Sequence, residues 1–150
     1  MEWVLDERSG AEEWGAIKFP SCASQEEATA QLIQLLKLVK SDEPLCITGH
    51  GNDFAIGGAG SDDDDWPWSY AEFAAILPSL VDGYGGPILL EVCAESVTSF
   101  AANMAVEVVR YGSLYGAWVF SYQKSISAIH EFPHPYKMTS NIELYGTQFR

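Results

Sequence analysis

The sequence has few basic residues, and this shortage limits its partners. Its 150 residues include 8 lysines and arginines against 21 aspartates and glutamates, a formal net charge of −13 at pH 7. Phosphate groups are bound by clustered lysine and arginine side chains, so this balance argues against nucleic acid and anionic membranes as partners. It favours solubility and attraction to a basic protein partner or to a basic protein substrate.

Cysteines are also few. Cys22, Cys46 and Cys93 form no Cys-x-x-Cys pair and have no histidine at metal-ligand spacing, so we expect no structural zinc site. His130 and His134 have the spacing of two ligands on a helix, but the prolines beside them prevent that helix, so no metal is assigned there. An odd number of cysteines points to reduced thiols, and one of them is a candidate reactive group.

Long hydrophobic segments are absent as well. No apolar run approaches the roughly 20 residues that a membrane-spanning helix needs. The first ten residues, MEWVLDERSG, carry acidic residues early and lack the apolar core of a secretory signal. We therefore expect a cytoplasmic protein. With 47% hydrophobic and 19% charged residues, the chain is expected to fold over residues 1–150 as a single domain.

Hydrophobic periodicity predicts alternating strands and helices. Two helices are expected to begin with capping boxes, at Ser24 to Glu27 and at Ser69 to Glu72, and Pro78 is expected to bend or end the second. The first two strand-like segments fit either a hairpin or an edge strand beside a core strand. The expected helices cover residues 24–40, 69–77 and 97–111, and the expected strands cover 3–5, 16–19, 45–48, 88–92, 114–120, 126–129 and 142–145.

This alternation predicts an α/β fold, a three-layer sandwich with a mostly parallel sheet and helices on both faces. Ligands of open α/β sheets bind beyond the carboxyl ends of the strands. His50, in the predicted sharp turn Gly49-His50-Gly51, follows one apolar strand, and Cys93 follows the next. If those two strands are neighbours, the two side chains meet at one rim of the sheet.

A thiol beside an imidazole is a nucleophile with its base. Cysteine attacks as the thiolate, and a nearby histidine is the usual way to form it near neutral pH. We assign Cys93 as the nucleophile and His50 as the base. The backbone amides of Gly51 and Cys93 are expected to donate to an oxyanion, because both are predicted to be turn amides without a partner in the sheet.

The apolar strand ending in His-Gly, followed by an apolar strand ending in Cys and then by a helix, resembles the caspase-like cysteine peptidases of clan CD. The resemblance covers roughly residues 44–122. It is closest in pattern to CHAT-type members and to the self-cleaving cysteine protease domains of bacterial toxins. It implies a caspase-like fold and hydrolysis of peptide bonds through an acyl-enzyme. By the same resemblance, His50 is the general base or acid, Cys93 the nucleophile and Gly51 an oxyanion donor.

Substrate binding is assigned to acidic and polar residues expected near this rim. The aspartate run lies in a long loop rich in glycine, residues 51–68, and loops of this length are commonly functional. It fits three roles: a solvated charged surface, selection of a basic substrate residue, or a calcium site, although contiguous acids converge poorly on one cation. No other cofactor is expected. The assigned residues are Glu95, Ser121, Asp62, Asp63, Asp64 and Asp65.

A non-enzymatic acidic binding protein is the alternative hypothesis. An immunity protein, an inhibitor or a decoy would mask a basic surface of its partner. The acid excess suits this role, as do Trp66 and Trp68 beside the aspartates, if they are exposed. A third hypothesis is a caspase-like scaffold that has lost catalysis. Single histidines and cysteines at strand ends are more often ordinary turn or core residues, so the enzyme hypothesis depends on His50 and Cys93 lying together.

Overall fold

The structure is a computed structural model that describes residues 2–4, 17–18, 24–51, 54–57, 67–93, 98–122 and 144–150. Within these ranges, strands alternate with helices. The helices are α1 (Gln25–Leu36), α2 (Tyr70–Ile76), the 3₁₀ helix η2 (Leu77–Ser79) and α3 (Thr98–Arg110). The strands are β1 (Glu2–Val4), β2 (Ile17–Lys18), β3 (Leu45–Gly51), β4 (Ala55–Gly57), β5 (Trp68–Ser69), β6 (Ile88–Cys93), β7 (Trp118–Tyr122) and β8 (Leu144–Gln148).

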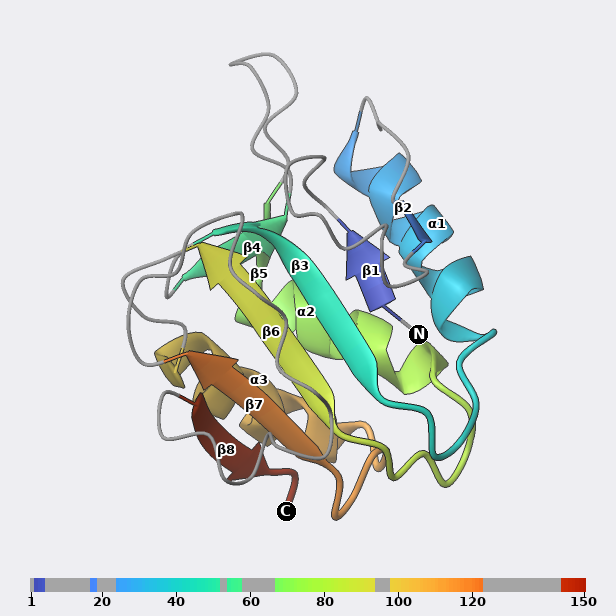
Figure 1. The fold of residues 1–150 in the computed structure, drawn as a ribbon, viewed down its shortest axis with the longest axis vertical. Helices are drawn as coiled ribbons and strands as arrows, with labels where there is room; N and C mark the ends of the chain where they lie inside the picture. The colour runs from blue at the N-terminus through green and yellow to red at the C-terminus, as the bar shows by residue number, and fades with distance from the viewer. Residues whose placement is uncertain are drawn as a thin grey trace.

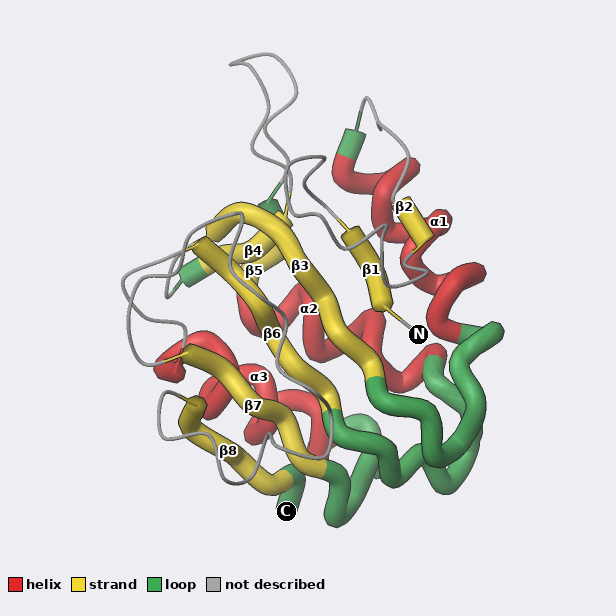
Figure 2. Tube along the Cα trace, viewed as in Figure 1, coloured by secondary structure: helices red, strands yellow, loops and turns green. Residues whose placement is uncertain are grey.

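The strands form one mostly parallel sheet in the order β2-β1-β3-β6-β7-β8 (Figure 1). The first five strands of this order are parallel to one another, and β8 pairs antiparallel with β7. Strands β4 and β5 lie off this path, and β4 is antiparallel to both β3 and β5. Helices α2 and α3 pack on each other behind the sheet, and α1 packs against α2 and η2 (Figure 2). The predicted α/β class with a mostly parallel sheet is confirmed. A helical layer on the opposite face is not found among the described residues and stays a prediction.

The first half of the central strand β6, residues 88–90, is buried on both faces. Ile88 and Leu90 are fully buried in the core shared with the three helices. Leu89, on the opposite face by the alternation of a strand, is 1% exposed. Its register partners Cys46 and Phe120 are buried as well. A continuous apolar run such as residues 88–90 is typical of a parallel sheet in the protein interior.

Helix α1 begins as predicted but ends early. The Ser24 side chain accepts a hydrogen bond from the Glu27 amide at 3.2 Å. The prediction extended this helix to Lys40, whereas it ends at Leu36. The amides of Leu38 and Val39 bond to carbonyls three residues back, a tighter pattern than that of the α-helix, and the Val39 side chain still packs in the core.

Helix α2 has a complete capping box. The Ser69 hydroxyl accepts from the Glu72 amide at 3.2 Å, and the Glu72 carboxylate accepts from the Ser69 amide at 2.7 Å. Pro78 lies in η2, directly after α2 ends, as predicted. The Gln25 side-chain amide donates to the Glu72 carboxylate at 3.1 Å and to the Pro67 carbonyl at 2.9 Å. These bonds join the starts of α1 and α2.

Helix α3 matches its predicted apolar face, since Ala101, Met104 and Val108 are fully buried. Gly112 follows it with φ +68°, the left-handed conformation expected at a helix C-terminus. Within the described ranges, no helix is long and apolar enough to cross a membrane.

The outer strands correct the sequence predictions. Strand β1 pairs with both β2 and β3 in parallel, so the first two segments form an edge strand and its inner neighbour rather than a hairpin. Strand β7 begins at Trp118 instead of Leu114, because Leu114 and Gly116 have positive φ values that do not fit a strand. Strand β8 covers Leu144–Gln148, later than predicted, and the predicted strand 126–129 lies outside the described residues.

Candidate functional site at the ends of β3 and β6

The parallel pairing of β3 with β6 aligns the two residues assigned to catalysis. The register begins at Leu45 and Ile88 and ends at His50 and Cys93, which are direct partners. Neighbouring strands lie about 4.8 Å apart, so the two backbone positions are next to each other. The strands carrying His50 and Cys93 are therefore neighbours, which was the condition on which the site depended.

Strand β3 is longer than predicted. The sequence analysis placed Gly49, His50 and Gly51 in a sharp turn, whereas β3 runs through all three residues to Gly51. The reason is β4, which pairs antiparallel with this end so that His50 lies opposite Gly57 and Gly51 opposite Ile56. Figure 1 shows β4 and β5 beside the upper end of β3. Glycine tolerates a turn but does not require one, and here a partner strand keeps the backbone extended.

His50 consequently has a register partner on each side. Cys93 lies opposite it on β6 and Gly57 on β4, while β1 pairs with the earlier part of the same strand at 46–48. Pairing on both sides fixes the backbone that carries the imidazole. Functional groups on paired strands are positioned more accurately than groups on loops.

The same pairing corrects the basis of the oxyanion prediction. Gly51 and Cys93 were expected to be turn residues without partners in the sheet, but both are terminal strand residues with register partners. Alternate positions of an antiparallel pair differ in whether their amides face the partner strand. An oxyanion role for the Gly51 amide therefore requires that this N–H face away from β4.

Ser121 does not join His50 and Cys93. Its side chain is fully buried in β7, and its register partner on β6 is Leu90, three residues before Cys93. Because three steps along a strand change the face, the position of Ser121 is on the opposite face of the sheet from that of Cys93. Burial and register thus separate Ser121 from the site. The other residues assigned to substrate binding, Glu95 and Asp62 to Asp65, lie outside the described residues.

Trp68 corrects the expectation of an exposed aromatic beside the aspartates. Its side chain is 1% exposed, and its indole N–H donates to the Thr29 hydroxyl at 2.9 Å. The ring also packs against Phe73, with ring centroids 5.8 Å apart. Trp68 is therefore a core residue that links β5 to α1. Trp66 lies outside the described residues.

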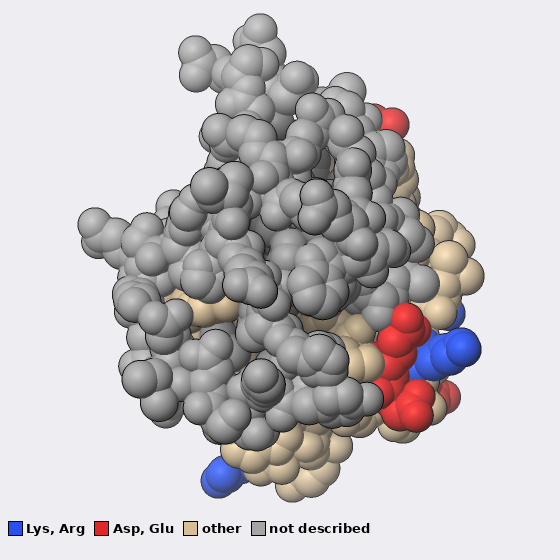
Figure 3. All heavy atoms as spheres, viewed as in Figure 1, with Lys and Arg blue, Asp and Glu red and all other residues tan. Residues whose placement is uncertain are grey.

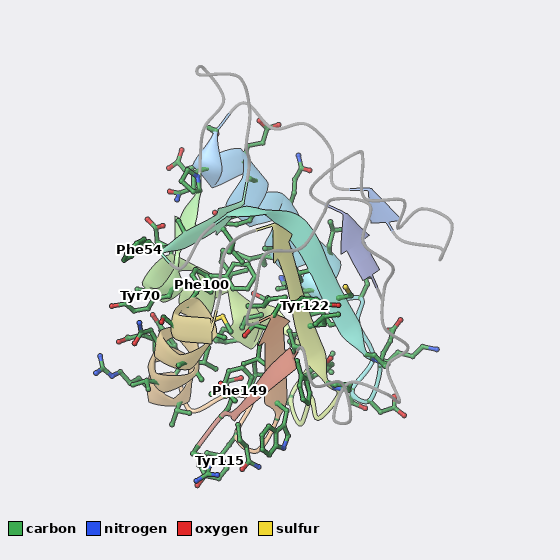
Figure 4. All side chains as sticks on the ribbon, turned by 60° about the vertical axis from the view of Figure 1, so that its left-hand side comes forward. Phe54, Tyr70, Phe100, Tyr115, Tyr122 and Phe149 are labelled. Atoms are coloured by element: carbon green, nitrogen blue, oxygen red, sulfur yellow. The ribbon has the colours of Figure 1, made fainter. Side chains whose placement is uncertain are left out.

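The sequence analysis missed Phe54 as a candidate for substrate contact. Phe54 is 80% exposed and comes directly before β4, three residues before the register partner of His50. In Figure 4 it extends outward beside the end of β3, as Tyr115 does at the far end of the molecule, whereas Phe100 lies inside the fold. A single phenylalanine in a polar loop carries no sequence signal of such exposure.

The described surface shows no metal site and no uniform charge. Among the residues that the structure describes, no group of three or more histidine, cysteine, aspartate or glutamate side chains is placed to hold a metal ion. On the face shown in Figure 3, one group of described acidic side chains lies next to basic ones at the right, while another acidic and another basic side chain lie apart from it.

Comparison of the chain with protein-family models, with curated proteins and with solved structures found no match. The resemblance to caspase-like peptidases thus rests on the sequence pattern of the two strand ends.

Proposed function

We propose that this protein is a cysteine peptidase of caspase-like fold, in which the Cys93 thiol is the nucleophile and the His50 imidazole transfers the protons. The observation that carries the proposal is the register pairing of these two residues at the carboxyl ends of adjacent parallel strands. Ligands of α/β sheets bind at such ends, and a thiol needs an imidazole close by to react near neutral pH.

The proposed reaction has two steps. The Cys93 thiolate attacks the carbonyl carbon of the scissile peptide bond, and the His50 imidazolium donates its proton to the departing amine as the C–N bond breaks. A thioester remains on Cys93. The neutral imidazole then removes a proton from a water molecule, whose oxygen attacks the thioester, so that the acid product leaves and the thiol is restored. The substrate would be a protein, and the net charge of −13 favours basic residues in it.

The proposal includes the three-layer sandwich. Strands β1, β3, β6 and β7 follow one another across the sheet in chain order, and right-handed crossovers between strands in this order place the connecting helices on a single face. A covering layer on the other face is therefore a separate part of the proposal. Burial of Leu89 on one face of β6 and Leu90 on the other supports a sheet that is covered on both sides. No cofactor is part of the proposal, and adding calcium or a chelator to the assays below tests the calcium role that the sequence leaves open for Asp62 to Asp65.

Alkylation of the native protein tests the dyad. Treatment with iodoacetamide near neutral pH, followed by peptide mass spectrometry, measures the labelling rate of each cysteine separately. We expect Cys93 to react fastest, and the variant His50→Ala to slow it about tenfold or more, because an unperturbed thiol is only a few per cent ionised at pH 7. His134→Ala is the matched control and should leave the rate unchanged. Equal, slow labelling of all three cysteines would contradict the proposal.

Peptide cleavage tests the reaction itself. A mixture of peptides containing basic and acidic residues is incubated with the wild type and with Cys93→Ala, and new termini are sequenced by mass spectrometry. Termini that form only with the wild type, next to basic residues, would support the proposal.

The alternative of an acidic binding protein makes a different prediction. Such a protein would bind a basic partner equally well after Cys93→Ala, and binding would weaken with salt. Burial of Trp68 removes one of the two aromatic residues on which that hypothesis relied.

A further inference from the structure

Glu91 occupies a register position next to the two proposed catalytic residues. It lies in β6 two residues before Cys93, and its partner on β3 is Thr48, which lies two residues before His50. Alternate positions of a strand share a face, and partners in a parallel pair share it too. Thr48, Glu91, His50 and Cys93 are therefore four adjoining positions on one face of the sheet, with Glu91 diagonal to His50.

The position is an unusual one for a carboxylate. Strand β6 lies inside the sheet, between β3 and β7, and Glu91 is two residues before the end of the strand. The residue before it, Leu90, pairs with Ser121, so the next residue of β7 beside Glu91 is Tyr122, which is buried. Leu89, the preceding residue on the same face of β6, is buried too, and a carboxylate withdrawn from water among such neighbours is costly unless a hydrogen bond or an opposite charge compensates it.

Among the adjoining register positions, one residue can supply that charge. Thr48 offers a hydroxyl, Cys93 and Tyr122 can only become negative, and Gly57, the β4 partner of His50, has no side chain. The imidazole of His50 alone can become positive. With strands about 4.8 Å apart and a rise of about 3.3 Å per residue, diagonal backbone positions are about 8 Å apart, a span that a glutamate and a histidine side chain can bridge together.

We propose that Glu91 is the positioning residue for His50, a carboxylate that orients the imidazole and stabilises its protonated form while Cys93 is the thiolate. This inference rests on the proposed function, in which His50 serves Cys93. The proposed site then has three members, Cys93, His50 and Glu91. A base that is oriented by a third group is a common arrangement for activated nucleophiles. If the Glu91 carboxylate instead bound a basic group of the substrate, it would not change the pKa of the His50 imidazole. The experiment below distinguishes these two roles.

The test is the pKa of the His50 imidazole, measured by NMR titration. The titrations use the Cys93→Ser background, so that the thiol does not titrate with the ring, and His50→Gln identifies the signal by its loss. A nearby carboxylate favours the charged imidazolium, so we expect Glu91→Gln to lower the pKa of His50 by about one unit. Glu107→Gln removes the same charge from α3, where Glu107 pairs with Arg110, and should leave that pKa unchanged.

A reciprocal measurement leaves Glu91 in place. Coupling between two groups acts equally in both directions, so His50→Gln should raise the carboxyl pKa of Glu91 by about the same amount as Glu91→Gln lowers that of His50. The inference is overturned if the two pKa values do not respond to each other. This outcome is distinct from failure of the proposed function. If the two pKa values are not coupled but Cys93 is alkylated rapidly, only the role of Glu91 is rejected. If the two pKa values are coupled but Cys93 is alkylated slowly, only the peptidase function is rejected.

Discussion

Cys46 and Cys93 lie on adjacent strands but four register positions apart, because Cys46 pairs with Leu89 and Cys93 with His50. Four residues of a strand span about 13 Å, whereas the two Cα atoms of a disulfide are about 4.4–6.8 Å apart. A disulfide between these two cysteines would require the strands to slide. Their positions in the sheet are therefore too far apart for a bond between the thiols, and we expect the two thiols to react separately.

The first prediction is that Cys46 is protected from alkylation while the protein is folded. Its side chain is 5% exposed and lies in the middle of the sheet, so a reagent reaches it only when β3 opens. Mass spectrometry should show Cys46 modified at a rate that rises steeply with urea across the unfolding transition. The labelling rate of Cys93 should rise far less. If Cys46 reacted in the native protein as fast as in the unfolded chain, the register and burial of β3 described above would be incorrect.

Local sequence signals predicted the three α-helices and their alternation with the strands of the parallel sheet. The capping box at Ser69 and the glycine at 112 act through bonds or dihedral angles within a few residues, so the sequence alone reveals them. The alternation of strands and helices likewise indicates a parallel sheet, because parallel neighbours need a long connection. The same reasoning predicted that the carboxyl ends of β3 and β6 lie at one edge of the sheet if the two strands are neighbours.

Long-range pairing explains what the sequence did not reveal. Strand β3 continues through Gly51 because two residues of β4 pair with it, and a strand as short as the three-residue β4 has no periodicity of its own. Trp68 looks exposed beside a run of aspartates, yet its indole bonds to Thr29, which is 39 residues away. In both cases the deciding partner is distant in sequence or too short to recognise.

The second prediction compares two adjacent glycines before β6. A methyl group on Gly86 would lie 2.6 Å from the Glu43 carbonyl oxygen and 2.8 Å from the Tyr84 hydroxyl, whereas one on Gly85 would approach nothing closer than 3.9 Å. Overlap with backbone forces the chain to move, so Gly86→Ala should lower the free energy of unfolding by about 2 kcal/mol. Gly85→Ala is the matched control and should change it by no more than about 0.5 kcal/mol. Equal effects in urea denaturation would show that this turn is packed differently.

The third prediction concerns stability at alkaline pH. The Tyr84 hydroxyl donates to the Glu43 carbonyl at 2.7 Å, and burial, assisted by the Glu43 charge, raises the pKa of this phenol well above its ordinary value of 10.0. The folded state thus favours the neutral phenol. Below pH about 10, the contribution of Tyr84 to the free energy of unfolding is fully present. Above that pH it is lost by up to about 1.4 kcal/mol per pH unit, until the pH reaches the pKa of Tyr84 in the folded protein.

The variant Tyr84→Phe isolates this effect. At neutral pH the variant should be less stable by about 1 kcal/mol, because the hydrogen bond is lost. Above pH about 10 the difference should shrink and then reverse, since phenylalanine has no proton to lose and the other titrating groups are common to both proteins. Urea denaturation at several pH values between about 8 and 11 measures both curves. Curves that stay parallel over this range would contradict the raised pKa.

The fourth prediction concerns the capping box that begins α2, the helix behind the β3–β6 pair. Ser69→Ala removes the acceptor of the Glu72 amide and should lower the free energy of unfolding by about 1 kcal/mol, which in a domain of this size lowers Tm by roughly 3 °C. Ser69→Asp restores an acceptor at the same position and should keep Tm close to that of the wild type. Thermal unfolding followed by circular dichroism measures both. If alanine and aspartate gave the same Tm, the hydroxyl would not contribute to stability, and the start of α2 would depend on the packing of Trp68 and Phe73 instead.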